Sequence, residues 1–212
     1  MNNELLENNN KVYLQGTVET TPELNHTVLD ENFYQFSLRV PRLSGQDDVL
    51  PVIISEKLLL DGIKVGDRVA LKGQFRSHNK LIDGKSKLIL AVYCKELCDW
   101  DENANPNVIE LKGYICKPTI FRITPFSREI CDLLLAVNRK YNKSDYIPCI
   151  SWGKNAQYTS KMGVGSSLVI TGRIQSREYT KHNDENDTVS QCVAYEVSVA
   201  SVSEMSKDED AV

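Results

Sequence analysis

The stretch VGDRVALKGQFRS, residues 65–77, recurs in altered form as VGSSLVITGRIQS, residues 164–176, at a shift of 99 positions. In both copies a Val-Gly turn precedes an apolar run that contains an internal glycine, Gly73 or Gly172. Glycine inside a strand often marks a bulge or a sharp bend, which a small closed barrel needs. The pair therefore predicts two copies of one small β-barrel within a single chain.

The rest of the chain supports this duplication. Three further matches run in the same order at a shift of 97 positions, and they are VYLQG (12–16) with IELKG (109–113), FSLRVPR (36–42) with LLLAVNR (133–139), and LPVI (50–53) with IPCI (147–150). Several matches at nearly one spacing are typical of a repeated structural unit, here of about a hundred residues.

Short runs rich in Val, Ile, Leu and Tyr alternate with turn residues, which favours strands. We expect strands at 11–20, 33–41, 49–55, 67–77 and 86–94, then at 107–117, 129–139, 146–152, 165–178 and 190–202. A short helix is expected after the third strand of each copy, in EKLLLDGI and KNAQYTSKM. Five strands with a helix after the third form the layout of an OB-fold, so the predicted fold is all-β with two tandem OB barrels. The predicted divisions are a first barrel (1–98), a linker (99–106), a second barrel (107–204) and a short acidic tail (205–212).

The composition is that of an ordinary globular protein, with 212 residues, 41% hydrophobic and 25% charged. No apolar run is long enough to cross a membrane. The polar N-terminus does not resemble a secretory signal, so we expect a cytoplasmic protein. A net charge of −4 argues against a nucleic-acid partner, but the acidic residues are concentrated in the first half and the tail.

Neither metal nor catalytic chemistry has a clear motif. The six cysteines form no Cys-x-x-Cys pair, and a thiol inside a strand acts mainly as a small hydrophobe. We find no Ser/His/Asp set, no phosphate-binding glycine loop and no carboxylate pair. The sequence therefore predicts a protein with no cofactor, no metal and no enzymatic activity.

Residues 141–154, YNKSDYIPCISWGK, place large aromatics beside lysines. Tyr146 and Trp152 are separated by an even number of positions, so a regular strand would present both on one face. The counterpart at 44–57, SGQDDVLPVIISEK, keeps the proline but has Ser, Val and Ser where Tyr141, Tyr146 and Trp152 stand. The barrel framework thus does not require these aromatics, and we expect them to face outwards and stack on a flat group.

Four segments of the second half, LLLAVNRKYN, DYIPCISWGKNAQ, GSSLVITGRIQSREY and VAYEVSV, closely resemble bacterial single-stranded DNA-binding proteins. The resemblance covers residues 107–204 in order and spacing and is faint in 11–97. It implies an OB-fold that binds single strands without strong sequence preference. The implied base-stacking residues are Tyr141, Tyr146, Trp152 and Tyr179. A stacked base contributes roughly 1–3 kcal/mol.

Cations flank these aromatics in the sequence and would meet the phosphates. The expected phosphate contacts are Arg139, Lys154, Arg173, Arg177, Lys140 and Lys143. The first copy lacks all four aromatics, because Ser44, Val49, Ser55 and Lys80 occupy the equivalent positions. It retains cations that could extend the groove weakly, namely Arg39, Arg42, Arg76 and Lys80.

The resemblance implies binding and protection of single-stranded DNA in replication, recombination and repair, at the bacterial nucleoid. Family members assemble four barrels, so two barrels per chain imply a homodimer. The resemblance implies replication and repair proteins as further partners, but the tail, SEMSKDEDAV, is acidic and lacks the terminal aromatic with which the family recruits them. Two alternatives stay open: an accessory replication factor of the primosomal kind, and an OB-fold module that binds mainly proteins and DNA only weakly.

Overall fold

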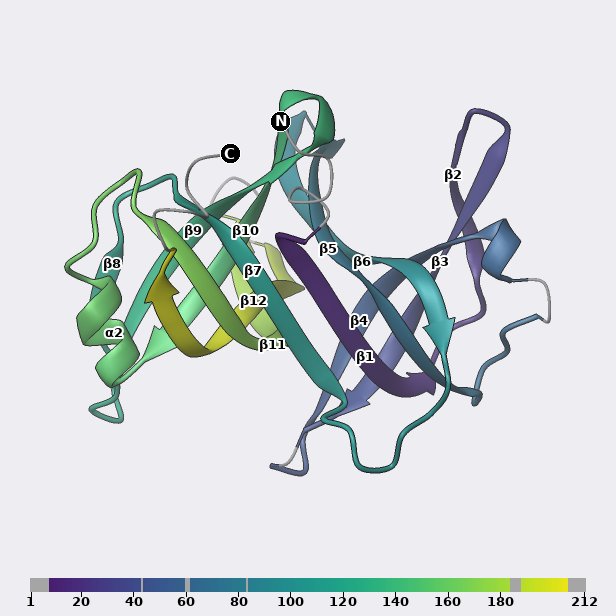
Figure 1. Cartoon of the computed structure of the whole chain (residues 1–212), viewed down its shortest axis with the longest axis horizontal. Helices are drawn as coiled ribbons and strands as arrows, with labels where there is room; N and C mark the ends of the chain where they lie inside the picture. The colour runs from purple at the N-terminus through teal and green to yellow at the C-terminus, as the bar shows by residue number, and fades with distance from the viewer. Residues whose placement is uncertain (1–7, 43, 60–61, 83, 184–187, 206–212) are drawn as a thin grey trace.

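A computed structural model of the chain describes residues 8–42, 44–59, 62–82, 84–183 and 188–205. Twelve strands account for most of it (Figure 1). Those of the first half are β1 (Asn10–Val18), β2 (Glu23–Val28), β3 (Glu31–Pro41), β4 (Asp47–Ser55), β5 (Arg68–Ile82) and β6 (Lys85–Cys98). Those of the second half are β7 (Asn107–Ile115), β8 (Ile120–Ile123), β9 (Glu129–Arg139), β10 (Lys143–Trp152), β11 (Ser167–Asn183) and β12 (Thr188–Glu204).

Strand pairing closes each half into a ring of five strands. In the first ring, β1 pairs with β3 and β5, β3 with β4, β4 with β6, and β6 with β5. In the second ring, β7, β9, β10, β12 and β11 repeat the same order. Each ring has one parallel pair, β4 with β6 or β10 with β12, and the other pairs are antiparallel. This is the OB-fold arrangement, so the predicted all-β fold class is confirmed.

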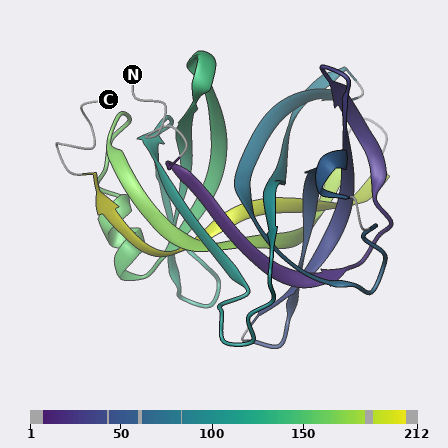
Figure 2. The ribbon, with the colours of Figure 1, turned by 45° about the vertical axis from the view of Figure 1, so that its right-hand side comes forward.

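The two rings are joined edge to edge. β1 and β7 run antiparallel, with Asn10 opposite Leu111 and Tyr13 opposite Val108. Figures 1 and 2 show these two strands lying side by side between the halves, so that one continuous sheet passes through both rings.

Alternation of side chains explains why these segments are strands. In β7 the residues Ile109, Leu111, Gly113 and Ile115 are buried, and the alternate positions 110, 112 and 114 are partly exposed. Such period-2 burial places one face of the strand in the core and the other towards solvent. The core of each ring is built mainly from branched aliphatic side chains of this kind.

The internal glycines of the fourth strand of each ring mark bulges, as predicted. The register shifts between Lys72 and Gly73, and again between Thr171 and Gly172. A Cβ on Gly73 would lie 2.2 Å from the carbonyl oxygen of Tyr93, and one on Gly172 would lie 2.2 Å from that of Ser198. Only glycine permits this close approach of two strands.

The structure adds two strands that the sequence did not predict. β2 and β8 form hairpins with β3 and β9 on the outer edges of the sheet. Nearly every residue of β2 and all of β8 are exposed. Neither strand therefore shows the alternation of apolar and polar residues that identifies a half-buried strand in a sequence. The long hairpins β5–β6 and β11–β12 also extend further than expected.

The structure differs between the two halves at the short helix expected after the third strand of each ring. α2 (Lys154–Thr159) confirms the helix after the third strand of the second ring. In the first ring the expected helix falls on residues 56–63, of which 60 and 61 lie outside the described residues, and the described part contains a 3-10 turn of three residues, η1 (Glu56–Leu58). Leu58, Leu59 and Ile63 of this segment pack against the core.

The proposed division of the chain at 98, 106 and 204 stays a prediction, and the tail from 206 onwards lies outside the described residues. Among the described residues, no helix combines the length and apolar character needed to cross a membrane.

Candidate nucleic-acid interface

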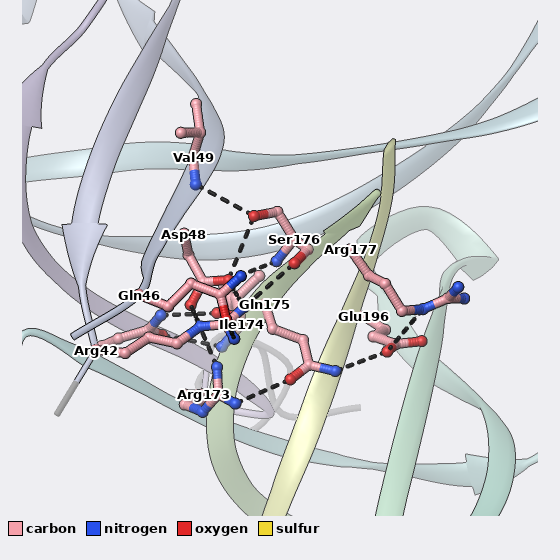
Figure 3. A network of polar contacts seen from close by, with 11 residues as sticks. Arg42, Gln46, Asp48, Val49, Arg173, Ile174, Gln175, Ser176, Arg177 and Glu196 are labelled. Carbon is pink, nitrogen blue, oxygen red and sulfur yellow. Dashed lines mark hydrogen bonds and ion pairs between the residues drawn. The ribbon is translucent and has the colours of Figure 1, made fainter. Parts of the chain in front are cut away.

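A buried carboxylate of the first ring reaches into the second ring (Figure 3). Asp48, at the start of β4, is fully buried and accepts a hydrogen bond from the backbone N–H of Ser176 in β11 at 2.7 Å. The hydroxyl of Ser176 in turn accepts from the N–H of Val49 at 3.2 Å. Arg42 donates through Nε to Asp48 at 2.6 Å, and Arg173 donates at 3.2 Å. We call these five residues the Asp48 cluster.

An equivalent set of contacts exists in which the two rings exchange roles, so that the second ring supplies the carboxylate. Asp145, at the start of β10, accepts from the backbone N–H of Ser77 in β5 at 2.7 Å. The Ser77 hydroxyl accepts from the N–H of Tyr146 at 2.7 Å, and Arg139 lies 3.2 Å from Asp145. We call Asp145, Ser77, Tyr146 and Arg139 the Asp145 cluster. Together with the Asp48 cluster it links the two rings through hydrogen bonds.

Burial raises the pKa of Asp145 above its usual value, against the opposing effects of the Ser77 N–H, Arg139 and Arg76. Burial also lowers the pKa of Arg173, helped by the nearby charge of Arg42. The pKa of Arg42 is raised because it hydrogen-bonds to Asp48. Closely packed guanidinium groups thus share a few buried carboxylates.

This pairing was missed by the sequence reasoning, which assigned Arg139 and Arg173 only to phosphates. The sequence shows only that both copies keep these residues, because Asp48 and Asp145 coincide at the repeat shift of 97, and Ser77 and Ser176 at 99; it does not show that Asp and Ser pair between the copies. Each arginine has a carboxylate partner and keeps part of its side chain exposed, so its predicted contact with a phosphate stays a prediction.

One groove, of about 960 Å³, lies between the β3–β4 turn of the first ring and the outer face of β11 and β12. Trp152 lines it and is 37% exposed, and we call it the tryptophan groove. Its basic side chains are Arg42, Arg128, Arg173 and Arg177, and its acidic side chains are Glu19, Asp47 and Glu178. Its charge is therefore mixed.

A second groove, of about 690 Å³, lies between β2, β3, β5 and β6 of the first ring and the start of β10. Tyr146 lines it and is 43% exposed, and we call it the tyrosine groove. It contains Arg76, Arg139 and Lys143, and none of its lining residues is an aspartate or a glutamate. A smaller hollow of about 350 Å³ shares these three cations and adds Lys140 and Tyr141.

Tyr141 has a backbone conformation that is unusual for an aromatic residue. Its φ is +64°, within the tight turn that links β9 to β10, and its side chain is 90% exposed. A left-handed conformation costs free energy outside glycine, and such positions cluster at functional sites. The turn holds the ring out into solvent, where a flat partner could cover it.

The four predicted stacking aromatics are all on the surface, but they do not share one groove. Trp152 and Tyr146 lie in different grooves, Tyr141 lies beside the second, and Tyr179 stands on the β11–β12 hairpin. The guanidinium of Arg177 is 5.8 Å from the centre of the Tyr179 ring. A strand of nucleic acid in contact with all four side chains would have to follow a long path around the second ring.

The remaining predicted cations are spread more widely. Lys154 is exposed at the first turn of α2. Arg39 is occupied by ion pairs with Glu19 and Asp47. Arg76 lies over the ring of Tyr93 in the tyrosine groove, at 5.2 Å. Lys80 stands on the β5–β6 hairpin.

The fold and the grooves define an OB-fold protein whose outer surface combines exposed aromatics with basic side chains. Residues 106–200 match the Single-strand binding protein family. Over 98 residues the chain is 34% identical to a single-stranded DNA-binding protein of Clostridium tetani, covering 43% of this chain and 68% of that protein. Single-stranded DNA-binding protein 3 of Clostridium acetobutylicum is 33% identical over the same length.

The likeness in fold extends beyond the matched half. The crystal structure of the single-stranded DNA binding protein of Thermus aquaticus superposes with a TM-score of 0.72, at 19% identity, and covers 93% of each chain. The chain belongs to the single-strand binding protein family.

Proposed function

We propose that this protein binds single-stranded DNA without strong sequence preference, by stacking bases on exposed aromatics and meeting phosphates with flanking cations. The observation that carries the proposal is the exposure of all four predicted stacking residues, Tyr141, Tyr146, Trp152 and Tyr179, which are between 37% and 90% exposed. Every base presents a flat π-face, so stacking tolerates any sequence. The relatives named above are single-stranded DNA-binding proteins.

The distribution of charge supports the same proposal despite the net charge of −4. The lining of the tyrosine groove has basic side chains and no carboxylate, whereas the arginines of the tryptophan groove are largely offset by its three carboxylates. A local positive field guides a polyanion more effectively than overall charge does. We place the main contacts on residues 107–204, with Arg139, Lys140, Lys143, Lys154, Arg173 and Arg177 meeting phosphates.

Titration of a fluorescent oligothymidine at two salt concentrations tests the proposal. Tyr146→Ala combined with Trp152→Ala is expected to weaken binding by at least about thirtyfold, because two stacked bases are lost. Tyr158→Ala is the matched control, since Tyr158 is a 41% exposed tyrosine of the same ring that lines neither groove. Absence of binding by the wild type at low salt would overturn the proposal, and so would an equal loss in the control.

We further propose a homodimer, in which two chains supply four barrels, as the family resemblance implies, and a role in replication, recombination and repair at the bacterial nucleoid. Light scattering on the purified chain tests the assembly. The expected mass is twice the 24.0 kDa of one chain, and a value of one chain at micromolar concentration contradicts it.

A primosomal type of accessory factor, or a module that mainly binds proteins, would also use an OB-fold. Both predict weak DNA binding that does not depend on Tyr146 and Trp152. The titration above therefore separates them from the proposed function.

A further inference from the structure

The first ring carries an aromatic cluster of its own, at positions that differ from the four expected in the second ring. His26 of β2 stacks on Phe33 of β3, with ring centres 4.9 Å apart and planes within 3°. The His26 ring also lies 6.5 Å from that of Tyr93 in β6. All three side chains line the tyrosine groove together with Tyr146 of the second ring.

These aromatics are not part of the core. Phe36 and Phe75 fill the interior of the first ring and are fully buried. Phe33 is three positions from Phe36, on the opposite face of β3, and it remains partly exposed, as do His26 and Tyr93. His26 covers one face of Phe33, and Arg76 lies over Tyr93, so a ligand would cover the parts of these rings that stay exposed in the groove.

Tyr146 is attached to the first ring as well as to its own. Its backbone N–H donates to the hydroxyl of Ser77 in β5, at 2.7 Å. Ser77 follows Arg76, whose guanidinium lies 5.2 Å from the centre of the Tyr93 ring. The Asp145 cluster thereby fixes an aromatic of the second ring beside the aromatic cluster of the first.

The charge in the groove favours an anion. Arg76, Arg139 and Lys143 line it, and the adjacent buried Asp145 is the one carboxylate that interacts with both arginines among the described residues. The pKa of Arg76 is lowered mainly by burial and to a smaller extent by the nearby charge of Arg139. The tryptophan groove differs, because three carboxylates offset its arginines.

The β5–β6 hairpin continues this positive surface beyond the groove. Lys80 stands directly opposite Lys87 in the strand pairing, and Lys85 is opposite Ile82 at the tip. Like charges opposite each other destabilise a sheet, and a polyanion laid along the hairpin would relieve that repulsion.

We propose that the tyrosine groove is a composite subsite for one base of a single strand, with Phe33 and Tyr93 of the first ring and Tyr146 of the second ring as its aromatic walls. Arg76 and Lys143 contact the phosphates on either side of this base, and the DNA strand continues from the groove along the β5–β6 hairpin. This inference rests on the proposed function and deepens it, because it gives the first ring a direct role in base binding.

Photocrosslinking locates the base directly. Oligothymidine in which single thymines are replaced by 5-iodouracil is irradiated with the full-length wild-type protein, and crosslinked peptides are mapped. We expect crosslinks to Phe33 or Tyr93 as well as to Tyr146. Crosslinks that occur only in the second ring would overturn the inference while leaving the proposed function intact.

Affinity gives a second test. Phe33→Leu combined with Tyr93→Leu keeps apolar volume and is expected to weaken oligothymidine binding by about fivefold or more, as loss of one stacked base predicts. Phe121→Leu is the matched control, because Phe121 is a 42% exposed aromatic that lines neither groove.

Unchanged affinity in the folded double variant contradicts the subsite. If that variant does not fold, the crosslinking result alone decides. A wild type that binds no oligothymidine instead contradicts the proposed function itself.

Discussion

The buried carboxylate of Asp48 in the first ring accepts a hydrogen bond from the backbone N–H of Ser176 in the second ring, at 2.7 Å. Asp145 of the second ring does the same for Ser77 of the first, also at 2.7 Å. The two contacts are related by the internal repeat, so each ring supplies one buried acceptor and receives one. They join the two rings in addition to the β1–β7 pairing.

Replacing Asp48 with alanine should destabilise the protein. The change leaves the Ser176 N–H without its acceptor, and Arg42 and Arg173 without their carboxylate. The unsatisfied Ser176 N–H alone costs about 1–3 kcal/mol. The loss of the two ion pairs adds to this cost, although water can partly compensate Arg42 and Arg173, whose side chains are 17% and 36% exposed. Urea unfolding measures the loss.

The neighbouring Asp47 provides the control. It is exposed, and its contact with Arg39 is long, at 3.5 Å. Such surface pairs contribute about 1 kcal/mol at most, so Asp47→Ala should have little effect. Equal losses in the two variants would mean that the Asp48 cluster does not stabilise the junction.

Asp145 should give the protein a particular dependence of stability on pH. Burial raises its pKa in the folded state, so folding increases its proton affinity. The folded state then binds more protons than the unfolded state at pH values between the unfolded pKa, about 3.9, and the raised folded pKa. The contribution of this group to the free energy of unfolding therefore falls as pH rises through that window.

Comparison of the wild type with Asp145→Asn isolates this effect, because asparagine does not titrate. The free energy of unfolding of the wild type minus that of the variant should decrease as pH rises from about 4 through the window. A difference that increases with pH would show that Arg139 and the Ser77 N–H outweigh the effect of burial.

The sequence predicted the rings better than it predicted the contacts between them. Alternation along a strand and the glycines at bulges, such as Gly73, are local signals, and they were sufficient for the OB-fold. The pairing of Asp48 with Ser176 joins residues 128 positions apart, and it exists only because β1 and β7 bring the rings together. The same junction distributes Tyr146 and Trp152 between separate grooves, which no spacing in the sequence could specify.

Gly73→Ala should destabilise the first ring. A Cβ at this position would lie 2.2 Å from the carbonyl oxygen of Tyr93, so the β5 and β6 backbones would have to separate. Overpacking of this kind typically costs about 1–3 kcal/mol. Thermal unfolding should show a lower midpoint, and Gly163→Ala, where no atom lies within 4 Å of the new Cβ, should leave it nearly unchanged. A midpoint for Gly73→Ala equal to that of the wild type would contradict the close approach of the two strands.

Lys143→Ala should reduce the salt dependence of oligothymidine binding. Lys143 is exposed in the lining of the tyrosine groove, where it would neutralise one phosphate and release its counterion. For single strands the slope of log affinity against log salt changes by about 0.7 for each phosphate contact, so the variant should show a slope shallower by about that amount. Lys117→Ala is the control, because Lys117 is an exposed lysine of the same ring that lines neither groove. If both variants reduce the slope equally, the effect comes from net charge and not from the groove, and the phosphate path past Tyr146 would have to be abandoned.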